Sequence, residues 1–100
     1  MSVTLSSAAP APVEPDAAPA TTCYSLLARP EPGVMPRVVE LFAKRGLVPL
    51  QWHSTASAST LAIEVQMGGL EREVADYIAR CMRQIVGVET VLTSETGLRG

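Results

Sequence analysis

In the first half of the chain, the spacing of apolar residues alternates between the two-residue period of a strand and the period of a helix. Residues 23–29 favour a strand that stops at Pro30, and the prolines and glycine of residues 30–33 predict a loop. Apolar positions then recur three and four residues apart, which predicts a helix over residues 34–45 with one buried face. Gly46 is the expected left-handed residue that ends this helix.

The next two segments read as a pair of strands. Val48, Leu50 and Trp52 alternate with polar residues and Pro49, and a proline cannot donate to a strand ladder, so this strand is expected at a sheet edge. Residues 61–67 show the most regular alternation of the chain, which is typical of a strand with one buried face.

A second helix and a last strand complete the pattern. Helical spacing of apolar residues predicts a helix over residues 70–85, with acids in its first turn and arginines in its last. Residues 86–94 predict a strand. The residues expected to share one face of it are Val86, Val88, Thr90 and Leu92.

This order, strand–helix–strand–strand–helix–strand, predicts a fold. Because strand–helix–strand crossovers are right-handed, both helices should cover one face of the sheet. The expectation is an α/β (α+β) ferredoxin-like sandwich with a four-stranded antiparallel sheet in the order 4-1-3-2. Trp52 and Met67 are expected to be hard to cover in one small copy, and the edge strand is bare. We therefore expect a homodimer joined edge to edge through Val48, Leu50 and Trp52.

Composition divides the chain of 100 residues into a single domain and its tails. Residues 1–22 are rich in alanine and proline, so we expect a disordered leader there. The domain is assigned to residues 23–94 and a flexible tail to residues 95–100. A folded unit this short is near the lower limit for a stable core, which also favours association.

The distribution of charge excludes several classes of function. The net charge of −2 is carried by Glu14 and Asp16 of the leader, and a balanced domain is a poor nucleic-acid binder. No apolar run reaches the ~18 residues of a membrane span, and the leader lacks the features of a secretory signal. Cys23 and Cys81 form no CxxC motif and favour buried thiols over a disulfide or metal site. Together these features indicate a cytoplasmic protein.

Catalytic chemistry finds little support in the sequence. His53 is the only histidine, and no nucleophile or base accompanies it, so we expect neither catalytic nor metal-binding residues. The loop of residues 29–37 leads from a strand into a helix N-terminus, where free N–H groups can bind a small carboxylate. Gly33 either lets a ligand approach the backbone or only makes the turn.

Several motifs in the first half resemble a known family. They are Pro32-Gly33-Val34-Met35, Arg37-Val38, Leu41-Phe42 and Lys44-Arg45-Gly46-Leu47. Their spacing resembles the ACT domain and, more narrowly, the small regulatory subunit of acetolactate synthase (acetohydroxyacid synthase) in its short single-domain form. The resemblance covers about residues 23–94, and the second half matches mainly by pattern.

This resemblance implies a non-catalytic homodimer that binds and activates the large catalytic subunit of acetolactate synthase in branched-chain amino acid biosynthesis. Thiamine diphosphate, Mg²⁺ and FAD are then expected only in that partner subunit. A small amino acid such as valine is the implied effector. The effector-binding residues implied by the resemblance are Pro30, Glu31, Gly33, Val34, Met35 and Val48.

Two positions depart from the family pattern. The loop of the family usually has an asparagine where this chain has Pro30, and a second asparagine where it has Val48. A site that loses hydrogen-bonding side chains loses affinity and selectivity, so we expect weak or absent valine feedback. The alternatives are a stand-alone ACT amino-acid sensor that serves another enzyme, and a small enzyme on the same fold.

Overall fold

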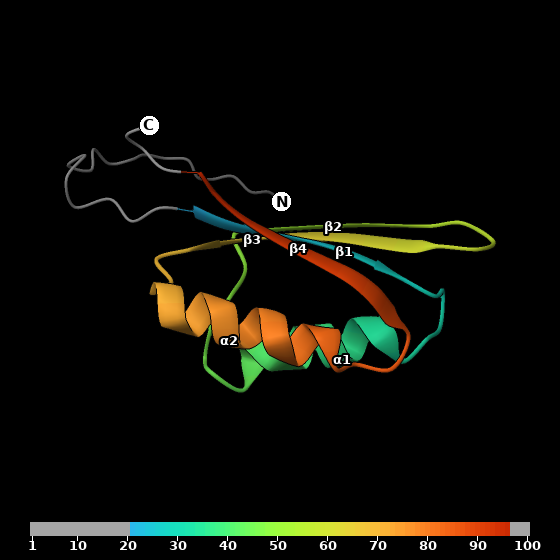
Figure 1. Ribbon diagram of the computed structural model, residues 1–100, viewed down its shortest axis with the longest axis horizontal. Coiled ribbons are helices and arrows are strands. Elements are labelled where there is room, and N and C mark those ends of the chain that lie inside the picture. The colour runs from blue at the N-terminus through green and yellow to red at the C-terminus, as the bar shows by residue number, and fades with distance from the viewer. Residues whose placement is uncertain (1–20, 97–100) are drawn as a thin grey trace, which may run out of the picture.

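The computed structural model describes residues 21–96. The elements are β1 (Thr21–Ala28), α1 (Val34–Ala43), β2 (Gln51–Ala56), β3 (Leu61–Gly68), α2 (Arg72–Arg83) and β4 (Val88–Thr96). The strands pair antiparallel in the order β2-β3-β1-β4, and both helices lie against one face of the sheet (Figure 1). This is the predicted order 4-1-3-2 counted from the other edge, so the ferredoxin-like βαββαβ fold is confirmed.

The first and last strands extend to the two ends of the described region. β1 begins at Thr21 and β4 ends at Thr96, so the sheet includes residues 21, 22, 95 and 96, which the sequence analysis assigned to the tails. The remainder of the predicted leader and tail lies outside the described residues. Between residues 21 and 96, no helix is long and apolar enough to cross a membrane.

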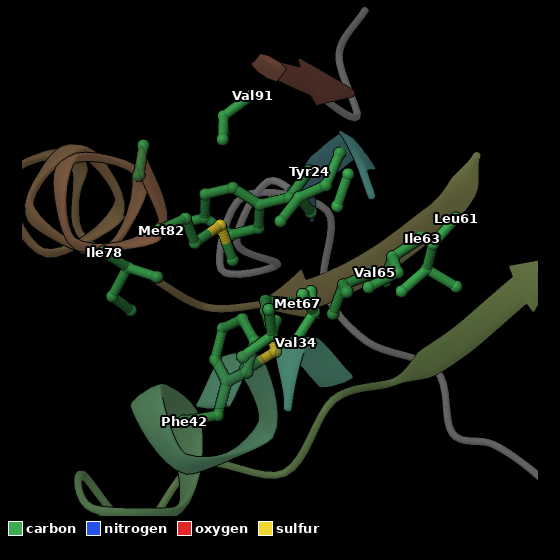
Figure 2. Packing of buried hydrophobic residues seen from close by; sticks show 14 residues of the cluster. Tyr24, Val34, Phe42, Leu61, Ile63, Val65, Met67, Ile78, Met82 and Val91 are labelled. Atoms are coloured by element: carbon green, nitrogen blue, oxygen red, sulfur yellow. The ribbon is translucent and has the colours of Figure 1, made fainter. Parts of the chain in front are cut away.

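The core lies between the sheet and the two helices. Alternate residues of β1 and β3 point toward the helices and are buried, among them Tyr24, Leu26, Ile63 and Val65 (Figure 2). From the helices, the fully buried side chains that meet them are Val34, Val38, Phe42, Ile78 and Met82. The helical periodicity of the sequence therefore identified the faces that form the core.

Two large side chains were expected to remain uncovered in a single copy. Met67 is only 1% exposed, so this expectation is wrong for that residue. It lies on the inward face of β3, which has a neighbouring strand on each side, so the helix layer covers it. Trp52 of β2 is half-buried and packs against the same core.

The edge position predicted for the second strand is confirmed, although β2 begins later than expected. Pro49 has no N–H, and the ladder to β3 starts where the N–H of Leu50 donates to the carbonyl of Gln66 at 2.8 Å. Gly46 follows α1 with a φ of 70° and is the left-handed residue that the sequence predicted.

The face predicted for the last strand is wrong. The register between β1 and β4 shifts at the end of β1, where Ala28 pairs with Val88 while Leu27 pairs with Thr90. One extra residue in β4 moves the later side chains to the opposite faces. Val91 therefore faces the core at 5% exposure, whereas Leu92 lies on the open face at 64%.

Candidate functional site

The loop between β1 and α1 is held against the turn that precedes β4. The N–H of Arg29 donates to the carbonyl of Gly87 at 2.8 Å. Within the loop, Arg29 Nε donates to Glu31 Oε2 at 3.0 Å, and both side chains are about half exposed. An exposed ion pair of this kind contributes less than about 1 kcal/mol, so the backbone contact does more to position the loop.

The loop packs against Gly87, a glycine of the turn before β4, where a larger residue would not fit. Gly87 has a φ of 100°, and a Cβ there would lie 3.1 Å from both Glu31 Oε1 and Val34 Cγ2. Gly33, in contrast, has an ordinary φ of −80°, and the nearest atom to an added Cβ would be the flexible guanidinium of Arg37 at 3.1 Å. Periodicity and turn residues do not reveal this role of Gly87, because its contact with the loop is long-range.

Few backbone donors are free at the start of α1. The N–H of Val34 donates to the carbonyl of Glu31 at 3.2 Å, and Pro36 has no N–H. Gly33 caps the helix without a side-chain hydrogen bond. The N–H groups of Gly33 and Met35 are therefore left for a ligand, which is a weaker anion site than an uncapped helix with all its donors.

The structure brings most of the expected effector residues together, but not all of them. The surface of the loop and of the start of α1 is formed by Pro30, Glu31, Gly33 and Met35. Val34 lies beneath them and is only 1% exposed. Val48 follows the other end of α1, and ten helical residues span about 15 Å. A single copy therefore separates Val48 from the loop.

The expected dimer residues differ in their exposure. Val48 and Leu50 are 82% and 65% exposed, directly before and at the start of the free edge of β2. Trp52 packs against the core instead. Two exposed aliphatic side chains therefore lie beside a strand edge that has no partner strand within residues 21–96, a combination that favours association.

Polar residues occupy the β2 side of the open sheet face. Gln51, His53, Glu64 and Gln66 line a shallow hollow of about 210 Å³. His53 pairs with Glu64 across the strands, and its Nε2 lies 3.5 Å from Thr55 Oγ1. Within residues 21–96, no group of three His, Cys, Asp or Glu side chains could hold a metal ion. Cys23 and Cys81 are free and half-buried.

One buried ionisable group lies at the opposite end of the domain from the loop. Tyr24 is 0% exposed, and its hydroxyl donates to the carbonyl of Ala75 at 2.8 Å. Burial, with a further contribution from the charge of Asp76, raises the pKa of Tyr24 to about 12. The hydroxyl therefore stays neutral and fixes the first turn of α2 onto β1.

Comparisons with known proteins agree with this fold. The ACT domain of GTP pyrophosphokinase from Chlorobium tepidum has a TM-score of 0.66 at 11% identity, covering 74% of this chain and 96% of that chain. The C-terminal domain of the MgtC protein from Mycobacterium tuberculosis has a TM-score of 0.66 at 14% identity, covering 85% of this chain and 95% of that chain. At these identities the likeness shows the fold alone.

Sequence comparison identifies the family. A search of curated protein sequences finds no match to this chain. A model of the ACT-like domain matches residues 15–98, which include every element of the sheet and both helices. Since this match extends over most of the sequence, the chain belongs to the ACT-like domain family.

Proposed function

We propose that this chain is a non-catalytic regulatory subunit that acts by association with an enzyme. ACT domains are regulatory modules that bind small molecules. The observation that carries the proposal is the exposed pair Val48 and Leu50 at the free edge of β2. These side chains gain by leaving water, and the free edge of β2 beside them gains hydrogen bonds from a partner.

The partner proposed for the assembly is the catalytic subunit of a thiamine-diphosphate-dependent acetolactate synthase. Its support is the motif resemblance of residues 32–47. In that assembly, thiamine diphosphate, Mg²⁺ and FAD belong to the catalytic subunit, and this chain contributes activation. Co-expression tests it: the two chains are expected to co-purify, and mixing them is expected to raise acetolactate output. Failure of both contradicts this choice of partner.

The first step of assembly is proposed to be a homodimer through β2. Antiparallel pairing of two β2 edges would extend the four strands of each copy into one eight-stranded sheet. It would also bring Val48 of one copy toward the other copy. Within a single copy, Val48 is separated from the β1–α1 loop. Val48 would thereby complete an effector site together with Pro30 and Met35.

Two leucines of equal exposure provide a matched test of this dimer. Leu50 at the β2 edge is 65% exposed, and Leu92 on β4 is 64% exposed. Leu50→Glu places two like charges at the proposed interface and is expected to give a monomer in sedimentation equilibrium. Leu92→Glu adds the same charge elsewhere and is expected to stay dimeric. Equal behaviour of the two variants contradicts a β2 interface.

Feedback by valine is proposed to be weak or absent. Pro30 and Val48 offer no side-chain hydrogen bonds, and the start of α1 offers only the N–H groups of Gly33 and Met35. Isothermal titration with valine is expected to give no heat of binding in the micromolar range. Micromolar affinity overturns this part of the proposal and leaves the activating role untouched.

A stand-alone amino-acid sensor for another enzyme is the second candidate. The match of the chain to the general ACT-like family favours it equally. This candidate predicts ligand binding by the isolated chain and no change in acetolactate output when the synthase is added. The two outcomes separate the candidates in one set of mixing experiments.

A further inference from the structure

A second hollow lies at the start of α2, at the opposite end of β1 from the effector loop. It has a volume of about 240 Å³ and is enclosed by the first turns of α2 and by the ends of β1 and β4. Thr22 and Arg29 are separated by seven residues of strand, or about 23 Å, so the two sites are distinct. A hollow of this size lies below the ~300 Å³ usual for drug-sized ligands and suits a small molecule.

A buried hydroxyl without a partner lies in this hollow. Thr22 is 1% exposed, lines the hollow, and its Oγ1 has no hydrogen-bond partner in the part of the chain that the structure describes. It lies on the inward face of β1, two residues before Tyr24, whose hydroxyl does have a partner in α2. Buried polar groups are almost always hydrogen-bonded, so an orphaned hydroxyl points to a missing partner.

The start of α2 supplies positive charge to the hollow. Glu71 caps this twelve-residue helix without a side-chain hydrogen bond, so the first-turn N–H groups keep their capacity to donate. The helix dipole adds positive potential there, and the guanidinium of Arg72 lines the same hollow. A carboxylate is the ligand group that suits these donors, since arginine binds it in a bidentate manner.

Negative charge and hydroxyls also line the hollow. Asp76 of α2 and Glu95 of β4 contribute carboxylates, and Thr93 and Ser94 contribute polar groups of β4. A simple anion in the hollow would face both carboxylates, and a simple cation would face Arg72 and the helix N-terminus. Arg72 and Asp76 lie one turn apart on the same face of α2, so a ligand that carries both charges finds a complementary group for each of them.

We propose that this hollow binds a small zwitterion of the amino-carboxylate class. Its carboxylate contacts Arg72 and the first-turn N–H groups of α2, its ammonium group lies between Asp76 and Glu95, and it gives Thr22 Oγ1 a hydrogen-bond partner. The site uses no residue of the β1–α1 loop. It is therefore separate from the effector site and does not require the proposed partner enzyme.

The test is an amide NMR titration of the full chain with glycine, acetate and methylammonium. Glycine is expected to bind in the millimolar range and to shift the amides of residues 72–76 and 93–95. Acetate carries only the carboxylate of glycine, and methylammonium carries only the ammonium group. Each is expected to bind at least roughly tenfold more weakly than glycine. No shift with glycine, shifts confined to residues 29–35, or an equal response to acetate alone overturns the proposal.

Two substitutions with matched controls complete the test. Arg72→Gln is expected to weaken glycine binding roughly tenfold. Arg80→Gln changes another exposed arginine two turns along the same helix and is expected to leave glycine binding unchanged. Thr22→Val removes the orphaned hydroxyl and is expected to raise the Tm of the unliganded chain by roughly 5 °C while weakening glycine binding. Thr55→Val on the exposed edge strand is its control. Unchanged glycine affinity in both Arg72→Gln and Thr22→Val overturns the proposal.

Discussion

The buried hydroxyl of Tyr24 makes a prediction about alkaline stability that a single substitution can test. The side chain is 0% exposed, and its hydroxyl donates to Ala75 O at 2.8 Å. Burial first, and the charge of Asp76 second, raise the pKa of Tyr24 from 10.0 to about 12. The folded state therefore favours the neutral phenol, and the change to test is Tyr24→Phe.

The sign and size of the effect follow from proton linkage. Below pH 10 both states keep the proton, and the stabilisation is complete. Between pH 10 and pH 12 the unfolded chain loses its proton while the folded chain retains it, so the free energy of unfolding falls as pH rises. A shift of two units corresponds to about 2.7 kcal/mol in total, at no more than about 1.4 kcal/mol per pH unit.

Phenylalanine at this position removes both the hydrogen bond to Ala75 and the loss of stability at alkaline pH. Tyr24→Phe loses one hydrogen bond, worth about 1 kcal/mol at neutral pH, because the Ala75 carbonyl still accepts within its own helix. The variant has no phenol to titrate at this site, so it lacks the alkaline loss. Wild type is expected to be the more stable protein at neutral pH and the less stable one at pH 12, with the two curves crossing near pH 11.

Urea unfolding followed by Trp52 fluorescence measures both curves, and tyrosinate absorbance follows the ionisation directly. Tyr77→Phe is the matched control, since Tyr77 is 45% exposed and its loss leaves Tyr24 in place. This control is expected to keep the alkaline slope of wild type. Parallel curves for wild type and Tyr24→Phe between pH 10 and pH 12 would refute the reasoning.

Four further substitutions test the loop, the core and the free edge of β4. Gly87→Ala is expected to destabilise the fold by about 1–2 kcal/mol in thermal unfolding, because Gly87 has a positive φ. Gly33→Ala is expected to change the stability by less than about 1 kcal/mol, because Gly33 has an ordinary φ. A loss of effector binding in Gly33→Ala would therefore report on the site and not on the fold. Phe42→Ala is expected to cost about 3–5 kcal/mol in urea unfolding, since the ring is 1% exposed. Arg83→Met removes the guanidinium that donates to the Val91 carbonyl at 3.0 Å and so frees the edge of β4. Sedimentation velocity is expected to show increased self-association of this variant. Unchanged sedimentation would show that the contact does not protect the edge.

The fold could be predicted because its signals are local. Helical spacing placed Val34, Val38 and Phe42 on one buried face, and Pro49 placed its strand at a sheet edge. The face of β4 could not be predicted in this way. It depends on one extra residue opposite the pairing of Leu27 and Ala28, and a register shift leaves no mark on the periodicity of either strand alone.

The candidate sites depend still more on contacts between distant segments. The sequence identified the β1–α1 loop through its prolines and glycine, but the residue that shapes it is Gly87, which lies 54 positions after Gly33 in the chain. Thr22 followed an alanine- and proline-rich stretch and was assigned to the leader on composition. Only its pairing with Met67 and Glu95 shows that it belongs to the sheet.

The position of Thr22 also changes what a truncation would test. A chain that starts after residue 22 would lose the first two residues of β1 and the buried hydroxyl beside α2. Neither loss includes a residue of the β2 edge, because Leu50 lies beyond β3, although at the same end of the sheet. Such a truncation should therefore impair the hollow at α2 more than dimerisation, and the two proposed activities of this domain can be separated along the chain.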